Sequence, residues 1–197
     1  AASDVYKRQG VDYTHKDLAD NIWVNEGEIP GNGIDDDGNG YVDDVHGVDF
    51  VEGDSDPMDE HGHGTHVAGI IAMTPGNGGG VGVAYGAKIM CVRAGQANGS
   101  FASTDIAKAI KYAADNGADV INMSFGGTGR SYLVESALQD AFPSCVLVAA
   151  AGNDGLPTTD AKQAGYLFTE DIYPAGYKYV IGVMATDNNK SLSLIHI

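Results

Sequence analysis

Three histidines stand close together in residues 61–69, which read HGHGTHVAG. Histidine serves in proteins as a metal ligand or as a general base. A zinc helix of the HExxH type needs two ligands four residues apart, with a glutamate between them. Here the spacings are two and three, with glycines and no glutamate in between, so zinc is the weaker alternative. We predict instead that His63 is a general base at the start of a helix, where glycines let backbone and substrate approach.

Asn153 is the second residue whose setting suggests chemistry. It follows the apolar run CVLVAAA and lies in the sequence GNDG. Acyl transfer needs a base for the nucleophile and a hydrogen-bond donor aimed at the developing oxyanion. Taken alone, Asn153 could equally make a turn. Together with His63 in the same chain, it favours acyl transfer, with the side-chain amide of Asn153 as the oxyanion donor.

The most acidic part of the chain, residues 32–44, is a candidate cation site. Carboxylates and an asparagine alternate there in an EF-hand-like order, followed by a glycine. The twelfth position from the first ligand is His46 and not glutamate, which excludes a complete EF-hand. We expect structural Ca²⁺ here, with a solvated acidic turn as the alternative. The expected ligands are Asp35, Asp37, Asn39, Tyr41 through its carbonyl, and Asp43, with Asp44 as an alternative to Asp43.

Strand and helix patterns alternate along the rest of the chain. The elements they predict must position His63, Asn153 and the acidic loop. This alternation predicts an α/β fold with a doubly wound, mostly parallel sheet and helices on both faces. Ligands of such sheets bind beyond the carboxyl ends of the strands, so the loops after Ser124 and Ala151 are expected to carry function. Helices are expected from His63 onwards, at 103–116 with Gly117 ending it, and at 132–142, and strands at 87–93, 119–124, 145–151 and 179–185, while 25–60 are expected to be loop.

Composition narrows the class of protein. The chain has 197 residues, 43% of them apolar, which suits one globular domain. A net charge of −16 argues against a nucleic-acid surface. No apolar run reaches the ~18 residues of a membrane helix, and no stretch typical of a signal peptide is visible. Cys91 and Cys145 each lie in an apolar run, which predicts two buried free thiols and no disulfide.

The histidine string HGTHVAG resembles the histidine motif of the subtilases, in which the first histidine is the catalytic base. Three further stretches resemble motifs of the same family and follow in the family's order: DVINMSFGG at 119–127, VAAAGNDG at 148–155, and YPA at 173–175 with YVIGVMAT after it. The resemblance implies a three-layer, subtilisin-like fold. It also implies a secreted serine endopeptidase that uses a Ser-His-Asp triad.

The resemblance also implies where substrate and metal bind. It assigns the base to His63 and the oxyanion donor to Asn153. Related subtilases carry Asp-rich calcium loops near residues 35–44. Polypeptide substrates, a monomer, and an extracellular or cell-envelope location are expected on the same grounds. The expected substrate-binding residues are Ser124, Phe125, Gly126 and Gly127, with Gly99, Ser100 and Phe101 on the facing wall of the cleft.

The sequence departs from the family at both ends. Residues 10–12 match the last three positions of the D-[ST]-G-x-D motif, but Arg8 stands at the aspartate and Gln9 at the serine or threonine. No GTSMA-like stretch with a nucleophilic serine is present. We therefore expect a partial catalytic domain over 10–190, truncated at both ends, with non-native flanks at 1–9 and 191–197 and no activity of its own. The alternative is a non-catalytic, calcium-stabilised binding module, a pseudoprotease.

Overall fold

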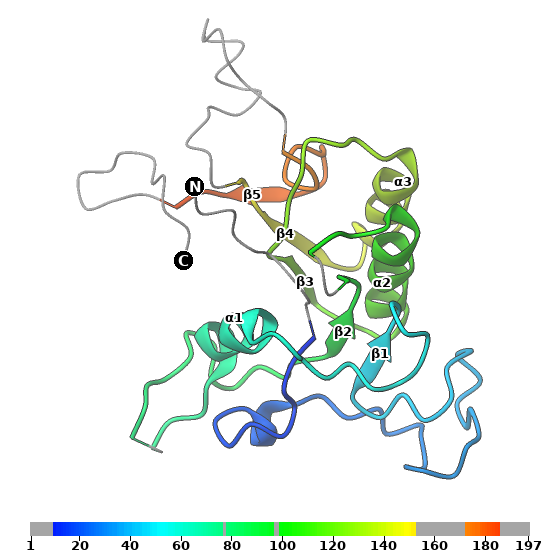
Figure 1. The fold of residues 1–197 in the computed structure, drawn as a ribbon, viewed down its shortest axis with the longest axis vertical. Helices are drawn as coiled ribbons and strands as arrows, with labels where there is room; N and C mark the ends of the chain where they lie inside the picture. The colour runs from blue at the N-terminus through cyan, green and yellow to red at the C-terminus, as the bar shows by residue number, and fades with distance from the viewer. Residues whose placement is uncertain (1–9, 77, 97–98, 153–171, 186–197) are drawn as a thin grey trace, which may run out of the picture. The chain divides into compact units, whose positions relative to one another are not determined.

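The computed structural model describes residues 10–76, 78–96, 99–152 and 172–185. They fall into two compact units, one up to Ala109 and one from Ile110 on. Each unit combines parallel strands with helices, as the predicted α/β class requires (Figure 1). Helix α2 (Ser103–Asp115) contributes to both units.

The first unit is built around a short parallel pair of strands. Strands β1 (Gly47–Asp49) and β2 (Cys91–Arg93) pair in register, so Asp49 lies beside Arg93. Both of these side chains are buried and form an ion pair. The 3₁₀ turn η1 (Ala19–Asn21) and helix α1 (His63–Ala72) complete the unit. Its hydrophobic core contains Val11, Leu18, Ile22, Ala68 and Cys91.

The second unit is a three-stranded parallel sheet in the order β3-β4-β5. Its strands are β3 (Val120–Met123), β4 (Val146–Ala150) and β5 (Ile181–Val183). Helix α3 (Tyr132–Ala141) connects β3 to β4, so the pair forms a parallel strand-helix-strand unit. The residue Ser131 caps α3 by accepting a hydrogen bond from the backbone N–H of Val134 at 3.4 Å.

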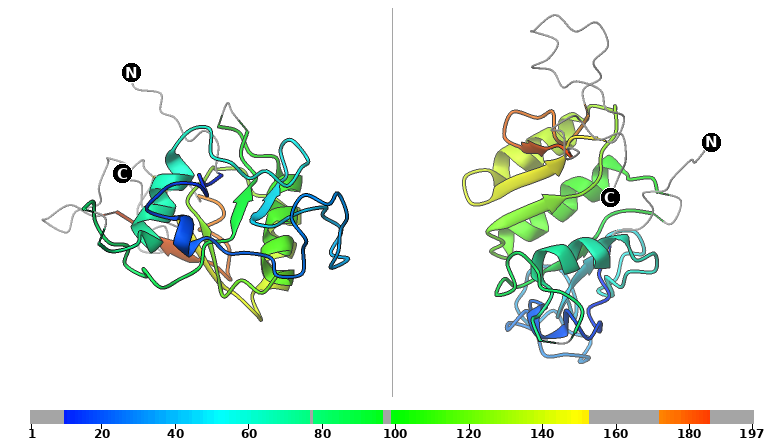
Figure 2. Two further views of the ribbon diagram at one scale, coloured as in Figure 1. Left: turned by 90° about the horizontal axis from the view of Figure 1, so that it is seen from below. Right: turned by 90° about the vertical axis from the view of Figure 1, so that its left-hand side faces the viewer.

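The two faces of this sheet differ in burial. Helix α3 and the part of α2 from Ile110 on cover one face, as the views from two directions show (Figures 1 and 2). Leu147 and Ala149 of the central strand point to the covered face and are buried. On the other face the apolar side chains are about half exposed. They are Val120, Val146, Ile181 and Val183.

The predicted helices are confirmed almost to the residue. The helix expected at 103–116 spans Ser103–Asp115, and the chain leaves it through Gly117 at φ 78°, a left-handed conformation that glycine adopts without a steric penalty. The strands predicted at 119–124 and 145–151 are also confirmed. Strand β1 was not expected, because 25–60 was predicted to be loop throughout. Three residues in a glycine- and aspartate-rich stretch form a strand only because β2 pairs with them.

Both cysteines are free and buried, as predicted. Burial raises the pKa of the Cys91 thiol to about 12, so this thiol stays protonated and unreactive at neutral pH. In the part of the chain that the structure describes, no helix is both long and apolar enough to cross a membrane.

Substitutions at two neighbouring residues of β4 test which face of the sheet the helices cover. Leu147 is 1% exposed and Val146 is 49% exposed. We expect Leu147→Ala to lower the free energy of unfolding by about 2–5 kcal/mol, because it leaves a cavity under the helices. Val146→Ala serves as the matched control and should cost less than about 1 kcal/mol. Urea unfolding followed by circular dichroism measures both values, and equal losses would contradict the assigned faces.

Candidate active site

His63 is the first residue of α1, and the backbone around it explains why the helix begins there. Gly62 is the N-cap residue, with φ 97° in the left-handed region. A glycine has no side chain that could accept a hydrogen bond from the first turn, so the usual capping interaction is missing at this position. The Thr65 N–H, in the first turn, therefore needs another acceptor.

Asp59 is this acceptor, although it lies three residues before the N-cap. Its Oδ1 accepts hydrogen bonds from the backbone N–H groups of His61 and Gly62, both at 2.8 Å. Its Oδ2 accepts from the backbone N–H of Thr65 at 2.9 Å and from the Thr65 hydroxyl at 2.6 Å. Burial by itself would raise the pKa of Asp59, but these hydrogen bonds outweigh it and the pKa is lowered. The carboxylate is therefore ionised at neutral pH, where the helix dipole also favours it.

The surroundings of His63 favour its neutral form. Partial burial lowers the pKa of the imidazole below its ordinary value. The nearby His61 and His66 act in the same direction, while the carboxylate of Asp59 raises the pKa. The lowering effects win. A neutral imidazole at pH 7 can accept a proton, which is the first requirement of a general base.

The segment 10–12 lies directly against the start of α1. A Cβ atom on Gly64 would come within 2.0 Å of the carbonyl oxygen of Gly10, so only glycine fits next to His63. The backbone N–H of Val11 donates to the carbonyl of Pro57 at 3.0 Å. The backbone N–H of Asp12 donates to the Thr65 hydroxyl at 2.9 Å. Residues 10–12, which match the last three positions of the family's aspartate motif, therefore lie beside the predicted base His63.

The acidic groups near this segment do not replace the aspartate that the motif lacks. The Asp12 carboxylate accepts hydrogen bonds from the N–H and hydroxyl of Thr14, at 3.0 and 2.6 Å, and so closes a local turn. Arg8 and Gln9 lie outside the described residues. Asn153, the predicted oxyanion donor, also lies outside them, and its role stays a prediction.

The predicted substrate-binding residues Ser124, Phe125, Gly126 and Gly127 follow the carboxyl end of β3, as expected for a parallel sheet. Both backbone hydrogen-bonding groups of Gly127 already pair with Tyr173, at 3.0 and 2.8 Å. The Ser124 hydroxyl accepts a hydrogen bond from the side-chain amide of Asn122 at 2.8 Å. Gly127 therefore anchors this loop, and the binding of a substrate backbone by these residues stays a prediction.

Gly99, Ser100 and Phe101 lie beside Gly95 and Gln96 in the first unit. Gly99 and Ser100 both make backbone hydrogen bonds with Gln96 at 2.9 Å, and Phe101 forms an antiparallel bridge with Gly95. Gly99 has φ 85°, which explains the glycine. These residues and the loop after β3 belong to different units, and their pairing across a cleft stays a prediction.

Two of the predicted metal ligands have another task in the structure. The carboxylate of Asp35 accepts hydrogen bonds from three successive backbone N–H groups, at 38–40, with lengths of 2.8 to 3.1 Å. The carboxylate of Asp43 does the same for the N–H groups at 31–33, at 2.7 to 3.1 Å. The backbone of Tyr41 donates to the side-chain oxygen of Asn39 at 2.9 Å. Asp35 and Asp43 thus hold the loop backbone in place.

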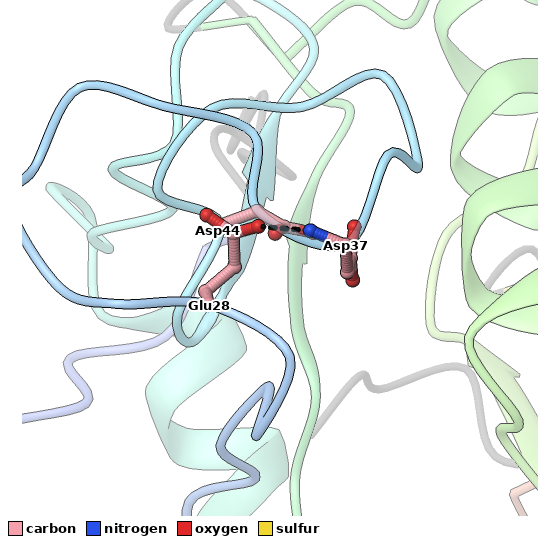
Figure 3. A group of neighbouring side chains, drawn as sticks. All are labelled: Glu28, Asp37 and Asp44. Carbon is pink, nitrogen blue, oxygen red and sulfur yellow. Dashed lines mark hydrogen bonds between the residues drawn. The ribbon is translucent and has the colours of Figure 1, made fainter.

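A different set of carboxylates comes together in this loop. One oxygen from each of Glu28, Asp37 and Asp44 lies within 4.8 Å of the others (Figure 3). Asp44 was only the alternative to Asp43 in the sequence prediction. Asp43 has a positive φ of 54°, which turns the backbone between Asp43 and Asp44. Their side chains therefore have different partners: Asp43 accepts from the backbone of Gly31, and Asp44 accepts from the side-chain amide of Asn39.

Glu28 was missed by sequence reasoning, because it precedes the EF-hand-like pattern. It accepts hydrogen bonds from the backbone N–H groups of Asp36 and Asp37, at 2.8 and 3.2 Å. The side-chain amides of Asn25 and Asn39 each bridge Asp37 and Asp44, at 2.9 to 3.2 Å. Of the predicted ligands, Asp37 and Asn39 therefore lie at this cluster. Within the described residues, the three histidines of 61–66 form no such group.

Comparison with known proteins decides the family. The profile of the subtilase family matches residues 9–194, which is nearly the whole chain. The chain belongs to the subtilase family. The α/β class predicted from the sequence is confirmed by the solved structure of the S41 psychrophilic protease, which matches with a TM-score of 0.69 and 30% sequence identity, over 91% of this chain and 52% of that one.

Curated relatives show how much of a subtilase the chain represents. The thermophilic serine proteinase of Bacillus sp. (strain AK1) is 41% identical over 186 residues, which cover 93% of this chain and 38% of that protein. Thermitase of Thermoactinomyces vulgaris is 42% identical over 151 residues, which cover 76% of this chain and 50% of that protein. This subtilase chain thus spans half or less of the length of these two relatives.

The neutral state of His63 in this subtilase can be measured by NMR. We expect the imidazole of His63 to titrate with a midpoint below the ordinary histidine pKa of about 6.5, because its partial burial disfavours the charged form. The folded state then binds the proton more weakly than the unfolded state, so the protein should lose stability as the pH falls below about 6.5. His63→Gln should reduce this loss. A His63 midpoint above 6.5 would contradict the assignment of a neutral base.

Proposed function

We propose that the protein containing this chain is a serine-type endopeptidase and that His63 is its general base. The observation that carries the proposal is the half-buried, neutral imidazole at the first residue of a helix whose start is fixed by Asp59. Membership of the subtilase family supports proteolysis in general, and one of the two curated relatives is named a thermophilic serine proteinase. Polypeptide substrates, and action outside the cell or in its envelope, belong to the same proposal.

The proposed reaction uses His63 twice. A serine hydroxyl attacks the carbonyl carbon of a peptide bond while the imidazole of His63 takes up the hydroxyl proton. The carbonyl oxygen becomes an oxyanion, to which the amide of Asn153 would donate a hydrogen bond. His63 then gives its proton to the leaving amine, and an acyl-enzyme remains. Water, deprotonated by the same imidazole, releases the acyl group and restores the serine.

We propose that the chain by itself performs none of these steps. Its sequence holds Arg8 at the aspartate position of the family motif and no GTSMA-like segment. Without an activated serine there is no acyl-enzyme to form. The second candidate function, a non-catalytic binding module, requires Arg8 to belong to the native protein and not to a non-native flank.

We also propose that the cluster of Glu28, Asp37 and Asp44 holds Ca²⁺. The donor set fits, because Ca²⁺ binds carboxylate oxygens and this cluster gathers three carboxylates. The side-chain amides of Asn25 and Asn39 donate hydrogen bonds to two of them. The bound cation would supply positive charge and tie the loop together. Hydrogen bonds already connect Asn25 to Asp44 and Glu28 to the backbone at 36 and 43, which brings the proposed ligands together in the loop.

A fusion protein tests the catalytic proposal. The chain is continued after Lys190 with the C-terminal part of thermitase, and Arg8→Asp and Gln9→Ser restore the motif. We expect a fluorophosphonate probe to label this fusion covalently and His63→Ala to slow the labelling at least about 10²-fold, the lower end of what general base catalysis contributes. The unfused chain should remain unlabelled. A fusion that folds but stays unlabelled would contradict the enzyme and leave the binding module.

Thermal unfolding tests the calcium proposal. Ca²⁺ at a hundredfold excess over its dissociation constant should stabilise the fold by about 2.7 kcal/mol, by mass action. Asp44→Asn should remove most of this gain, because Asp44 is buried in the cluster. Asp20→Asn removes the same charge at an exposed site of the first unit and should keep the gain. Equal melting temperatures with Ca²⁺ and with a chelator would leave only a solvated acidic loop.

A further inference from the structure

The hydroxyl of Thr65 is a junction between three segments of the first unit. It donates a hydrogen bond to Oδ2 of Asp59 at 2.6 Å and accepts one from the backbone N–H of Asp12 at 2.9 Å. A threonine hydroxyl has one donor and two acceptor positions, so both interactions are compatible at once. Thr65 thereby connects the helix start, the residue Asp59 before it and the segment 10–12.

Each of these segments is held at a second point as well. The carboxylate of Asp59 fixes the backbone at 61–62 through Oδ1. The backbone of Val11 is fixed to Pro57. Gly64 and Gly10 touch backbone to backbone, with no room for a side chain. His63 lies inside this frame, since its two neighbours and Thr65 are all held.

We propose that Thr65 is a positioning residue for His63: its hydroxyl, oriented by Asp59, sets the distance and angle between the helix start and the segment 10–12. This proposal rests on His63 being the base and deepens that assignment. The segment 10–12 matches the last three positions of the family motif whose aspartate would orient the base. In a protein that carries this aspartate, the hydroxyl of Thr65 would therefore set the geometry between the motif and His63. A valine has the same shape as threonine but can make neither hydrogen bond.

The alternative is that Thr65 only stabilises the helix as one of several capping contacts. Its backbone N–H still donates to Asp59 when the hydroxyl is removed, so a purely structural role predicts a small loss of stability and nothing more. A positioning role predicts a change at two other places, the amide of Asp12 and the imidazole of His63. The charged or titratable groups that act on this imidazole are Asp59, His61 and His66.

The test uses the whole chain and three substitutions. Thr65→Val removes the hydroxyl, Thr65→Ser keeps it, and Thr128→Val is the control at an exposed threonine in the second unit. NMR measures hydrogen exchange at the Asp12 amide and the titration of His63. We expect Thr65→Val to speed exchange at Asp12 at least tenfold and to move the His63 midpoint toward that of a solvated histidine. Thr65→Ser and Thr128→Val should keep both values.

The proposal is overturned if Thr65→Val leaves the Asp12 exchange rate and the His63 midpoint unchanged, or if Thr65→Ser fails to restore them. Should Thr65→Val not fold, Asp59→Asn makes the same test from the other side. Its amide oxygen can still accept from 61–62, while its amide nitrogen can accept neither from the Thr65 hydroxyl nor from the Thr65 backbone N–H. Faster exchange at the Asp12 amide is expected again, and its absence overturns the proposal. The His63 midpoint is not compared in this variant, because the loss of the Asp59 charge itself lowers the His63 pKa. None of these readouts uses activity, so they are independent of the labelling experiment on the fusion.

Discussion

The carboxylate of Asp59 is the interaction on which the rest of the site depends. Helix α1 begins after a glycine that offers no capping side chain. Asp59 accepts from one N–H group of the first turn, that of Thr65, from the Thr65 hydroxyl, and from the N–H groups of His61 and Gly62 just before the helix. Hydrogen bonds to a charged group contribute about 1.5–3 kcal/mol each, so this residue decides where the helix starts. The position of His63, the orientation of the Thr65 hydroxyl and the place of the segment 10–12 all follow from it.

The same device recurs in the acidic loop and explains part of the chain's strongly acidic composition. Asp35 and Asp43 each accept three backbone N–H groups, as Asp59 does. Where the chain forms neither helix nor strand, carboxylates replace the hydrogen-bond partners that secondary structure would supply. The consequence is a division of labour. Asp35 and Asp43 shape the loop, Asp37 and Asp44 meet at one point where a cation would neutralise them, and Glu28 does both, because it belongs to this cluster and also accepts three backbone N–H groups.

Sequence reasoning worked where structure is local and failed where it depends on distant partners. Helices α2 and α3 were predicted almost to the residue, because the helical spacing of their apolar residues depends only on residues close in the sequence. Strand β1 was missed, because its three residues become a strand only through β2. The helix start at His63 was predicted from its motif. Asp59 was not, because capping rules examine the N-cap position, and this carboxylate reaches it from three residues earlier. An aspartate shortly before a glycine-started helix, with threonine at the third helical position, is the signal that could have found it.

A double-mutant cycle between Asp59 and Thr65 tests the central claim most directly. Asp59→Asn, Thr65→Val and the double variant are unfolded in urea, and the free energies of unfolding are compared with that of the parent chain. If the carboxylate and the hydroxyl act as one unit, the two losses should not add, and the coupling energy should reach about 1 kcal/mol or more. A coupling energy below about 0.3 kcal/mol, within the range of independent sites, would contradict the account.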